Sequence, residues 1–102
     1  MGAMSTAVVF EQPGKMALRY VRLPEPHSTD CVVEVRWTGI STGTERLLWD
    51  GRMPPFPGLA YPLVPGYESV GNVIEPGKDT DLTVGQRVFV PGSKGFTDVH
   101  GL

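Results

Sequence analysis

The sequence has little of what disulfide and metal sites require. It contains one cysteine, Cys31, and two histidines, His27 and His100, among 102 residues. A single cysteine excludes a disulfide framework within the chain and any zinc site built from several cysteines. Neither histidine has a cysteine or a second histidine at ligand spacing, so both are expected to be exposed loop residues. Cys31 begins an apolar strand pattern, which predicts a core thiol rather than a nucleophile.

Long apolar runs and an excess of positive charge are also missing. No run approaches the roughly 20 apolar residues that a membrane-spanning helix needs, and no secretion signal is visible. The formal net charge of -2 provides no basic field for nucleic acid. With 40% hydrophobic and 20% charged residues, the composition predicts a globular, cytoplasmic domain with no membrane span and no nucleic-acid partner.

Glycine and proline are instead abundant, at 13 and 10 residues. They separate short runs rich in β-branched residues, which is typical of an all-β domain with many turns. Within residues 31–40, strand alternation places Cys31, Val33, Val35 and Trp37 on one face. The strands are expected within residues 5–10, 16–24, 31–40, 68–77 and 86–92. Residues 52–66, which hold five prolines, and residues 93–102 are expected to be irregular loops.

One short helix is expected, at residues 44–49. Thr42 or Thr44 can cap its start, Glu45 lies in its first turn, and Gly51 can close its end. Residues 1–3 are interpreted as a cloning remnant. The domain is therefore expected to span residues 4–102 and to be incomplete on its C-terminal side, because no terminating feature follows the last loop.

Three segments occur in the order and spacing of a known family. They read GISTGTE at 39–45, PGYESVG at 65–71 and VGQRVFVPG at 84–92. Together they resemble the catalytic domain of the medium-chain dehydrogenase/reductase superfamily, and the resemblance covers nearly the whole chain from Ala7 onward. It implies a mainly β fold, a GroES-like (chaperonin-10-like) partly open β-barrel with one short helix, truncated here before a Rossmann domain.

The departures from this family concern zinc. Its zinc-dependent members carry a cysteine ligand in the first segment, where this chain has Ser41 or Thr42, and a histidine in the second, where it has Tyr67. Neutral hydroxyl groups are poor zinc ligands. Glu68 matches the family, and Glu45 replaces an aspartate. These departures therefore predict a site without zinc, against the default of the family. Its candidate catalytic residues are Tyr67, Glu68, Ser41, Thr42 and Glu45.

The longer run over residues 39–71 resembles one branch of this superfamily. That branch oxidises the 3-hydroxyethyl group of a bacteriochlorophyllide to a 3-acetyl group with NAD, in bacteriochlorophyll a biosynthesis. The resemblance implies a tetrapyrrole substrate, and a homo-oligomer formed through the missing domain. No Gly-x-Gly-x-x-Gly motif occurs in the chain. NAD is therefore expected to bind to the missing Rossmann domain, with no cofactor-binding residue in this chain, which alone is expected to be inactive.

A large, flat, apolar macrocycle needs hydrophobic and aromatic walls. The stretch from Trp49 to Tyr61, which includes most of the proline-rich segment, offers five candidates: Trp49, Met53, Phe56, Leu59 and Tyr61. Arg46 and Arg52 are candidates for binding the propionate carboxylate of the substrate. The alternative is that these apolar side chains cover the end of the barrel. For the second motif, the alternative is that Tyr67 packs at the barrel rim while Glu68 binds backbone amides.

Two other functions fit the same sequence. One is a zinc-free quinone or enone reductase of the same superfamily, which needs no base for an alcohol. The other is a GroES-like binding module without enzymatic activity. A glycine-rich dinucleotide motif further along the natural chain would favour the dehydrogenase.

Overall fold

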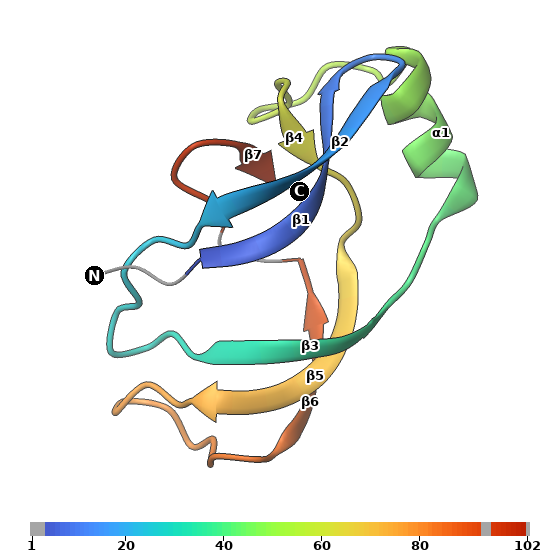
Figure 1. Ribbon diagram of the computed structural model, residues 1–102. Coiled ribbons are helices and arrows are strands. Elements are labelled where there is room, and N and C mark those ends of the chain that lie inside the picture. The colour runs from blue at the N-terminus through green and yellow to red at the C-terminus, as the bar shows by residue number, and fades with distance from the viewer. Residues whose placement is uncertain (1–3, 93–94, 102) are drawn as a thin grey trace.

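In the computed structural model, residues 4–92 and 95–101 are described, and they form a mainly β domain with one helix (Figure 1). The predicted cloning remnant, residues 1–3, lies outside the described residues. The elements are β1 (Met4–Gln12), β2 (Lys15–Arg22), β3 (Val32–Thr38), α1 (Thr42–Asp50), β4 (Leu63–Val64), β5 (Glu68–Glu75), β6 (Arg87–Pro91) and β7 (His100–Gly101). The prediction of a mainly β fold with one short helix is confirmed.

The strands form two sheets, which Figure 1 shows as an upper and a lower layer. One sheet has the order β2-β1-β4-β7 and the other the order β3-β5-β6. The hairpin of β1 and β2 turns at Gly14, whose φ of 78° is a conformation that glycine adopts without a steric penalty. In the second sheet β5 pairs with both β3 and β6 and therefore lies between them; both pairs are antiparallel.

Two apolar clusters are buried around the first sheet and α1. In the first, Val9 and Val21 are fully buried and pack with Val99. In the second, Phe10 of β1, Leu48 of α1 and Leu63 of β4 are buried together. The second cluster therefore anchors the helix to the first sheet. The backbone N–H of Gly14 also donates to the carbonyl of Trp49 at 2.9 Å, which ties the end of α1 to the hairpin turn.

The helix starts earlier than the sequence predicts. It runs over Thr42–Asp50 rather than 44–49, and its N-cap is Ser41 rather than Thr42 or Thr44. The N-cap prediction was wrong because the Ser41 carbonyl already accepts the Glu45 N–H at 2.9 Å. Gly51 closes the helix as predicted, with a left-handed φ of 72° and an N–H that donates to the carbonyls of the last turn.

Two segments predicted as irregular loops contain short strands. Leu63 of β4 pairs with Phe10 of β1, and β4 runs parallel to β7 at the pairs Leu63–His100 and Val64–Gly101. His100 is therefore exposed in a strand, whereas a loop was predicted. These strands were missed because they are two residues long and arise from pairing between distant segments. The rest of 93–102 is irregular over 95–99, and residues 93, 94 and 102 lie outside the described part.

The alternation predicted for residues 31–40 is interrupted. β3 begins at Val32, so Cys31 precedes the strand and is half-buried instead of lying in the core. The pairing with β5 shifts between Val32 and Val33 and again between Val35 and Trp37. Such bulges re-aim side chains locally. Trp37, at the end of β3, is 56% exposed.

Candidate functional site

The three sequence motifs meet at one end of the second sheet. The backbone N–H of Gly39 donates to the carbonyl of Glu68 at 3.0 Å, which joins the first motif to the second. The N–H of Gly92 donates to the carbonyl of Tyr67 at 2.6 Å, and Glu68 pairs with Pro91 in the register of β5 and β6. The structure thus brings together segments that are far apart along the chain.

Glycines allow close approach at this junction. A Cβ added to Gly39 would lie 2.9 Å from Oε2 of Glu68, which is too close for a real side chain. Gly66 has a φ of 91°, which a side-chain-bearing residue rarely adopts, and a Cβ there would lie 3.4 Å from Oε1 of Glu45. Gly39 therefore makes room for the Glu68 carboxylate of another motif, whereas Gly66 is favoured by its positive φ.

Tyr67 and Glu68 lie at the surface of the junction. Tyr67 is 37% exposed, and within residues 4–92 and 95–101 its hydroxyl has no hydrogen-bond partner. Glu68 is exposed at the start of β5, and its carboxylate has no cationic partner in the same described ranges. Both groups can therefore exchange protons with a ligand or with solvent.

The start of α1 supplies the other candidate polar groups. Ser41 is half-buried and makes no capping bond with its side chain, and Thr42 is exposed. Glu45 is half-buried in the first turn. Burial raises the pKa of the Glu45 carboxyl above its ordinary value, while a hydrogen bond from the Ser41 backbone opposes that change with a smaller effect. The Glu45 carboxyl therefore keeps its proton to a higher pH than an ordinary glutamate does.

The donor set at the junction does not fit zinc. At the positions where the family resemblance implies zinc ligands, the chain has hydroxyl side chains, from Ser41 or Thr42 and from Tyr67. In the described part of the chain, no group of three or more histidine, cysteine, aspartate or glutamate side chains is placed to hold a metal ion. We therefore assign no metal-binding role to these residues.

The apolar side chains predicted to bind the substrate differ in how far they are buried. Trp49, Met53, Leu59 and Tyr61 all pack against the buried cluster that joins α1 to the first sheet. The Trp49 ring meets Phe10 edge-on, with centroids 5.3 Å apart, and the Tyr61 hydroxyl donates to the carbonyl of Leu48. Phe56 is 42% exposed. The structure thus leaves four of the five apolar candidates half-buried against the core.

The two predicted arginines share one carboxylate. Nη2 of Arg52 lies 3.0 Å from Oδ2 of Asp50, and Nε of Arg46 lies 3.9 Å from the same oxygen. All three side chains lie near the end of α1. Asp50 partly neutralises both cations, and the pairs are solvent-exposed, so each contributes little to stability.

A cavity of about 210 Å³ opens beside the motif junction. Its walls are Trp37, Thr38, Gly39, Glu68, Ser69, Val70 and Phe89. Sequence reasoning did not select Trp37 or Phe89 as site residues. A signal was present, since Phe89 lies inside the third motif and Trp37 precedes the first motif by two residues. Only the strand pairing shows that they lie on either side of Val70 in the sheet.

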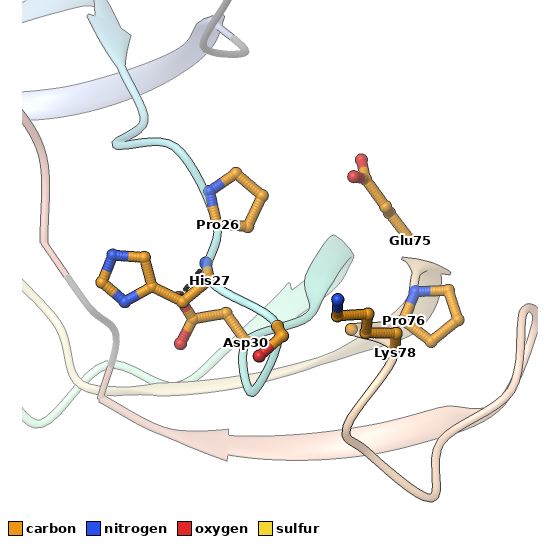
Figure 2. Close-up of a pocket in the computed structure, with 8 residues that line it drawn as sticks. Pro26, His27, Asp30, Glu75, Pro76 and Lys78 are labelled. Atoms are coloured by element: carbon orange, nitrogen blue, oxygen red, sulfur yellow. Dashed lines mark hydrogen bonds between the residues drawn. The ribbon is translucent and has the colours of Figure 1, made fainter.

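A second cavity, of about 430 Å³, lies at the opposite end of β3 and β5. Figure 2 shows two loops facing each other there, one with Pro26, His27 and Asp30 and the other with Pro76 and Lys78. The backbone N–H of His27 donates to Oδ2 of Asp30 at 2.7 Å. This cavity is remote from all three motifs.

Within the described ranges, no helix is both long and apolar enough to cross a membrane.

Comparison with known proteins agrees with the fold and the motifs. The family model of the alcohol dehydrogenase GroES-like domain matches residues 27–100. This match covers β3, α1, β5 and β6 and includes all three motifs, at 39–45, 65–71 and 84–92.

Curated relatives include two proteins named 2-desacetyl-2-hydroxyethyl bacteriochlorophyllide A dehydrogenase. The one from Cereibacter sphaeroides is 53% identical over 90% of this chain, and the one from Rhodobacter capsulatus is 48% identical over 88%. L-galactonate-5-dehydrogenase of Escherichia coli is 32% identical over 85% of this chain. The chain spans only 29% of the length of the first two relatives and 25% of the third.

Proposed function

Since the chain belongs to the alcohol dehydrogenase GroES-like domain family, we propose that it is the catalytic domain of an NAD-dependent alcohol dehydrogenase. The proposed substrate is the 3-hydroxyethyl group of a bacteriochlorophyllide, and the product is the 3-acetyl group. One observation carries this proposal: the chain is 53% identical, over 90% of its length, to a relative named for the hydroxyethyl bacteriochlorophyllide.

Oxidation of a secondary alcohol to a ketone removes one hydride and one proton. When bound, NAD accepts the hydride, and no residue of this chain is assigned to hold it. The proton must pass to a group within hydrogen-bond reach of the alcohol oxygen. We assign this step to Tyr67, which is partly exposed at the junction of the motifs. Its oxygen accepts the alcohol proton while its own phenolic proton leaves through the neighbouring polar groups.

The neighbouring polar groups then carry the proton toward solvent. Glu68 adjoins Tyr67 in the chain and is exposed. Ser41 and Thr42 begin the helix whose Glu45 lies near Gly66, directly before Tyr67. In this proposal the site works without zinc, because hydroxyl groups stand at both ligand positions.

The chain alone is proposed to be inactive. A dehydrogenase needs a dinucleotide site, and the 102 residues contain no Gly-x-Gly-x-x-Gly motif after a strand. A Rossmann domain elsewhere in the full-length protein would supply that site.

The test uses the full-length enzyme, NAD and a hydroxyethyl bacteriochlorophyllide, with metal analysis of the same preparation. The expected result is an acetyl product formed together with NADH, without stoichiometric zinc. Reduction of a simple quinone by NADPH without alcohol oxidation would instead identify a quinone reductase. Absence of both reactions would favour a binding module, and stoichiometric zinc would overturn the proposed site.

A further inference from the structure

The second sheet exposes a row of apolar side chains that the proposed chemistry does not use. Trp37 of β3, Val70 of β5 and Phe89 of β6 are direct partners across the three strands. Residues opposite each other in a sheet project from the same face. Trp37 is 56% exposed and Phe89 60% exposed. Single exposed apolar residues need no explanation, but a contiguous row with a polar rim is typical of a binding surface.

This row faces away from the buried side of the sheet. Residues Gly71 and Val73, which alternate with Val70 along β5, are both buried. Since side chains alternate between the two faces of a strand, Val70 and its partners lie on the opposite, outer face. We call the set Trp37, Val70, Phe89 and Arg87 the Trp37 face.

The Trp37 face opens onto the candidate site. The cavity of about 210 Å³ is lined by Trp37, Val70 and Phe89 and also by Gly39 and Glu68 of the first two motifs. A ligand seated on the aromatic rings therefore reaches Glu68 with one edge. A drug-sized ligand usually occupies a larger pocket, so a tetrapyrrole would insert only one edge into the cavity and rest on the face with the remainder.

A positive charge borders the same surface. The Arg87 guanidinium carbon lies 5.0 Å from the centroid of the Trp37 ring. Across residues 4–92 and 95–101, Arg87 has no carboxylate within ion-pair distance. Glu34 lies in the cross-strand row of Arg87, with Asn72 between them. Its carboxylate pairs with Arg36 at 3.3 Å instead. Arg87 thus combines an aromatic neighbour with an unpaired charge.

We infer that the Trp37 face binds the macrocycle of a carboxylate-bearing tetrapyrrole. The flat ring system stacks on Trp37 and Phe89, its propionate carboxylate pairs with Arg87, and its reacting edge enters the cavity beside Glu68. Exposed aromatic rings suit offset stacking with a planar π system, and a guanidinium suits a carboxylate. This inference rests on the proposed function, because that function supplies the tetrapyrrole.

The Trp37 face is more accessible to a ligand than the side chains predicted from the sequence to bind the substrate. Trp49, Met53, Leu59 and Tyr61 pack against the core, and Arg46 and Arg52 share the carboxylate of Asp50. Using those side chains for a ligand would expose part of the buried cluster. The Trp37 face needs no such rearrangement.

The experiment measures equilibrium binding to the full-length protein without NAD. The probes are pheophorbide a and its methyl ester, which share one macrocycle and differ in the free carboxylate. Phe89→Ala should weaken both probes about tenfold, because it removes one stacking surface. Phe89→Leu, which keeps most of the apolar volume, should also weaken both. Arg87→Gln should weaken the acid roughly threefold and leave the ester unchanged, as expected for an exposed charge pair.

Two matched controls accompany these variants. Leu18→Ala removes a 73% exposed apolar side chain from β2, in the other sheet, and Arg36→Gln removes a cation that pairs with Glu34. Neither should change the affinity for either probe. Wild-type affinity in Phe89→Ala, Phe89→Leu and Arg87→Gln would overturn the inference, as would an equal loss of acid and ester binding in Arg87→Gln.

Turnover of the hydroxyethyl substrate separates this inference from the proposed function. If the wild-type enzyme oxidises that substrate and the three face variants leave KM unchanged, the inference fails and the function stands. If pheophorbide a binds with the predicted variant pattern but the hydroxyethyl substrate is not oxidised, the inference stands and the proposed function fails.

Discussion

The backbone N–H of Gly39 donates a 3.0 Å hydrogen bond to the backbone carbonyl of Glu68. This bond joins the residue after β3 to the first residue of β5, and it lies beside the Glu68 carboxylate. The absence of a side chain at Gly39 keeps that carboxylate in place, because a Cβ would lie 2.9 Å from Oε2. One glycine therefore serves both the sheet and the candidate site.

Gly39→Ala should separate stability from function. The clashing atom is the end of a flexible side chain, so Glu68 can move aside, and we expect a loss of less than about 1 kcal/mol in the free energy of unfolding. The displaced carboxylate should lower kcat of the full-length enzyme. Denaturant unfolding and steady-state kinetics measure the two effects. Unchanged kcat with a large loss of stability would contradict the assigned role of Glu68.

Gly71→Ala should instead be a folding defect. A Cβ at this buried position would lie 2.2 Å from the backbone carbonyl oxygen of Glu34 and 2.8 Å from Cγ1 of Val33. Backbone atoms in a sheet cannot move aside easily, so we expect a loss of about 3 kcal/mol or more. Gly43→Ala is the matched control, since nothing lies within 4 Å of the added Cβ in α1. It should stabilise the protein by up to about 1 kcal/mol, and similar unfolding midpoints for both variants would refute the prediction.

Tyr67→Phe tests the proton acceptor. The change removes one hydroxyl from a side chain that is 37% exposed, so the free energy of unfolding should change by less than about 0.5 kcal/mol. Loss of a general base typically lowers the rate about a hundredfold or more. Acetyl product formed per enzyme measures this in the full-length protein. Tyr20→Phe, at a 74% exposed position on β2, should keep wild-type kcat; equal activity in both variants would assign the proton to another group.

The raised pKa of Glu45 predicts that the stability of the protein depends on pH. Burial raises the pKa of its carboxyl in the folded state above the ordinary value of 4.5. At pH values between the ordinary pKa and the higher folded-state pKa, the folded state holds more protons than the unfolded state. The free energy of unfolding therefore falls as pH rises through this range. Glu45→Gln removes this decline.

The measurement is denaturant unfolding of both proteins at pH 4 and pH 7. The free energy of unfolding of Glu45→Gln, relative to wild type, should be higher at pH 7 than at pH 4. A relative stability that stays constant or decreases would show that the folded-state pKa of Glu45 is not raised.

Local sequence patterns were enough to predict much of the fold. Alternating residues and glycine or proline turns located β1, β2, β5 and β6, because strand periodicity and turn chemistry act over a few residues. The two-residue strands β4 and β7 were missed, since neighbouring residues carry no information about the pairing of Leu63 with His100. The helix end at Gly51 was predicted from its chemistry, whereas its start depends on the backbone conformation of Ser41.

The sequence by itself determined which segments carry the family motifs and that hydroxyl side chains stand where the family resemblance implies zinc ligands, because these are properties of residue identity and spacing. Only the tertiary structure decided which side chains meet. Strand pairing brought Gly39 to Glu68 and placed Trp37 and Phe89 on either side of Val70. Packing against the buried cluster of Phe10, Leu48 and Leu63 made Trp49 and Tyr61 half-buried. Contacts between distant residues form where apolar area is buried and backbone groups find partners, and this depends on the whole chain.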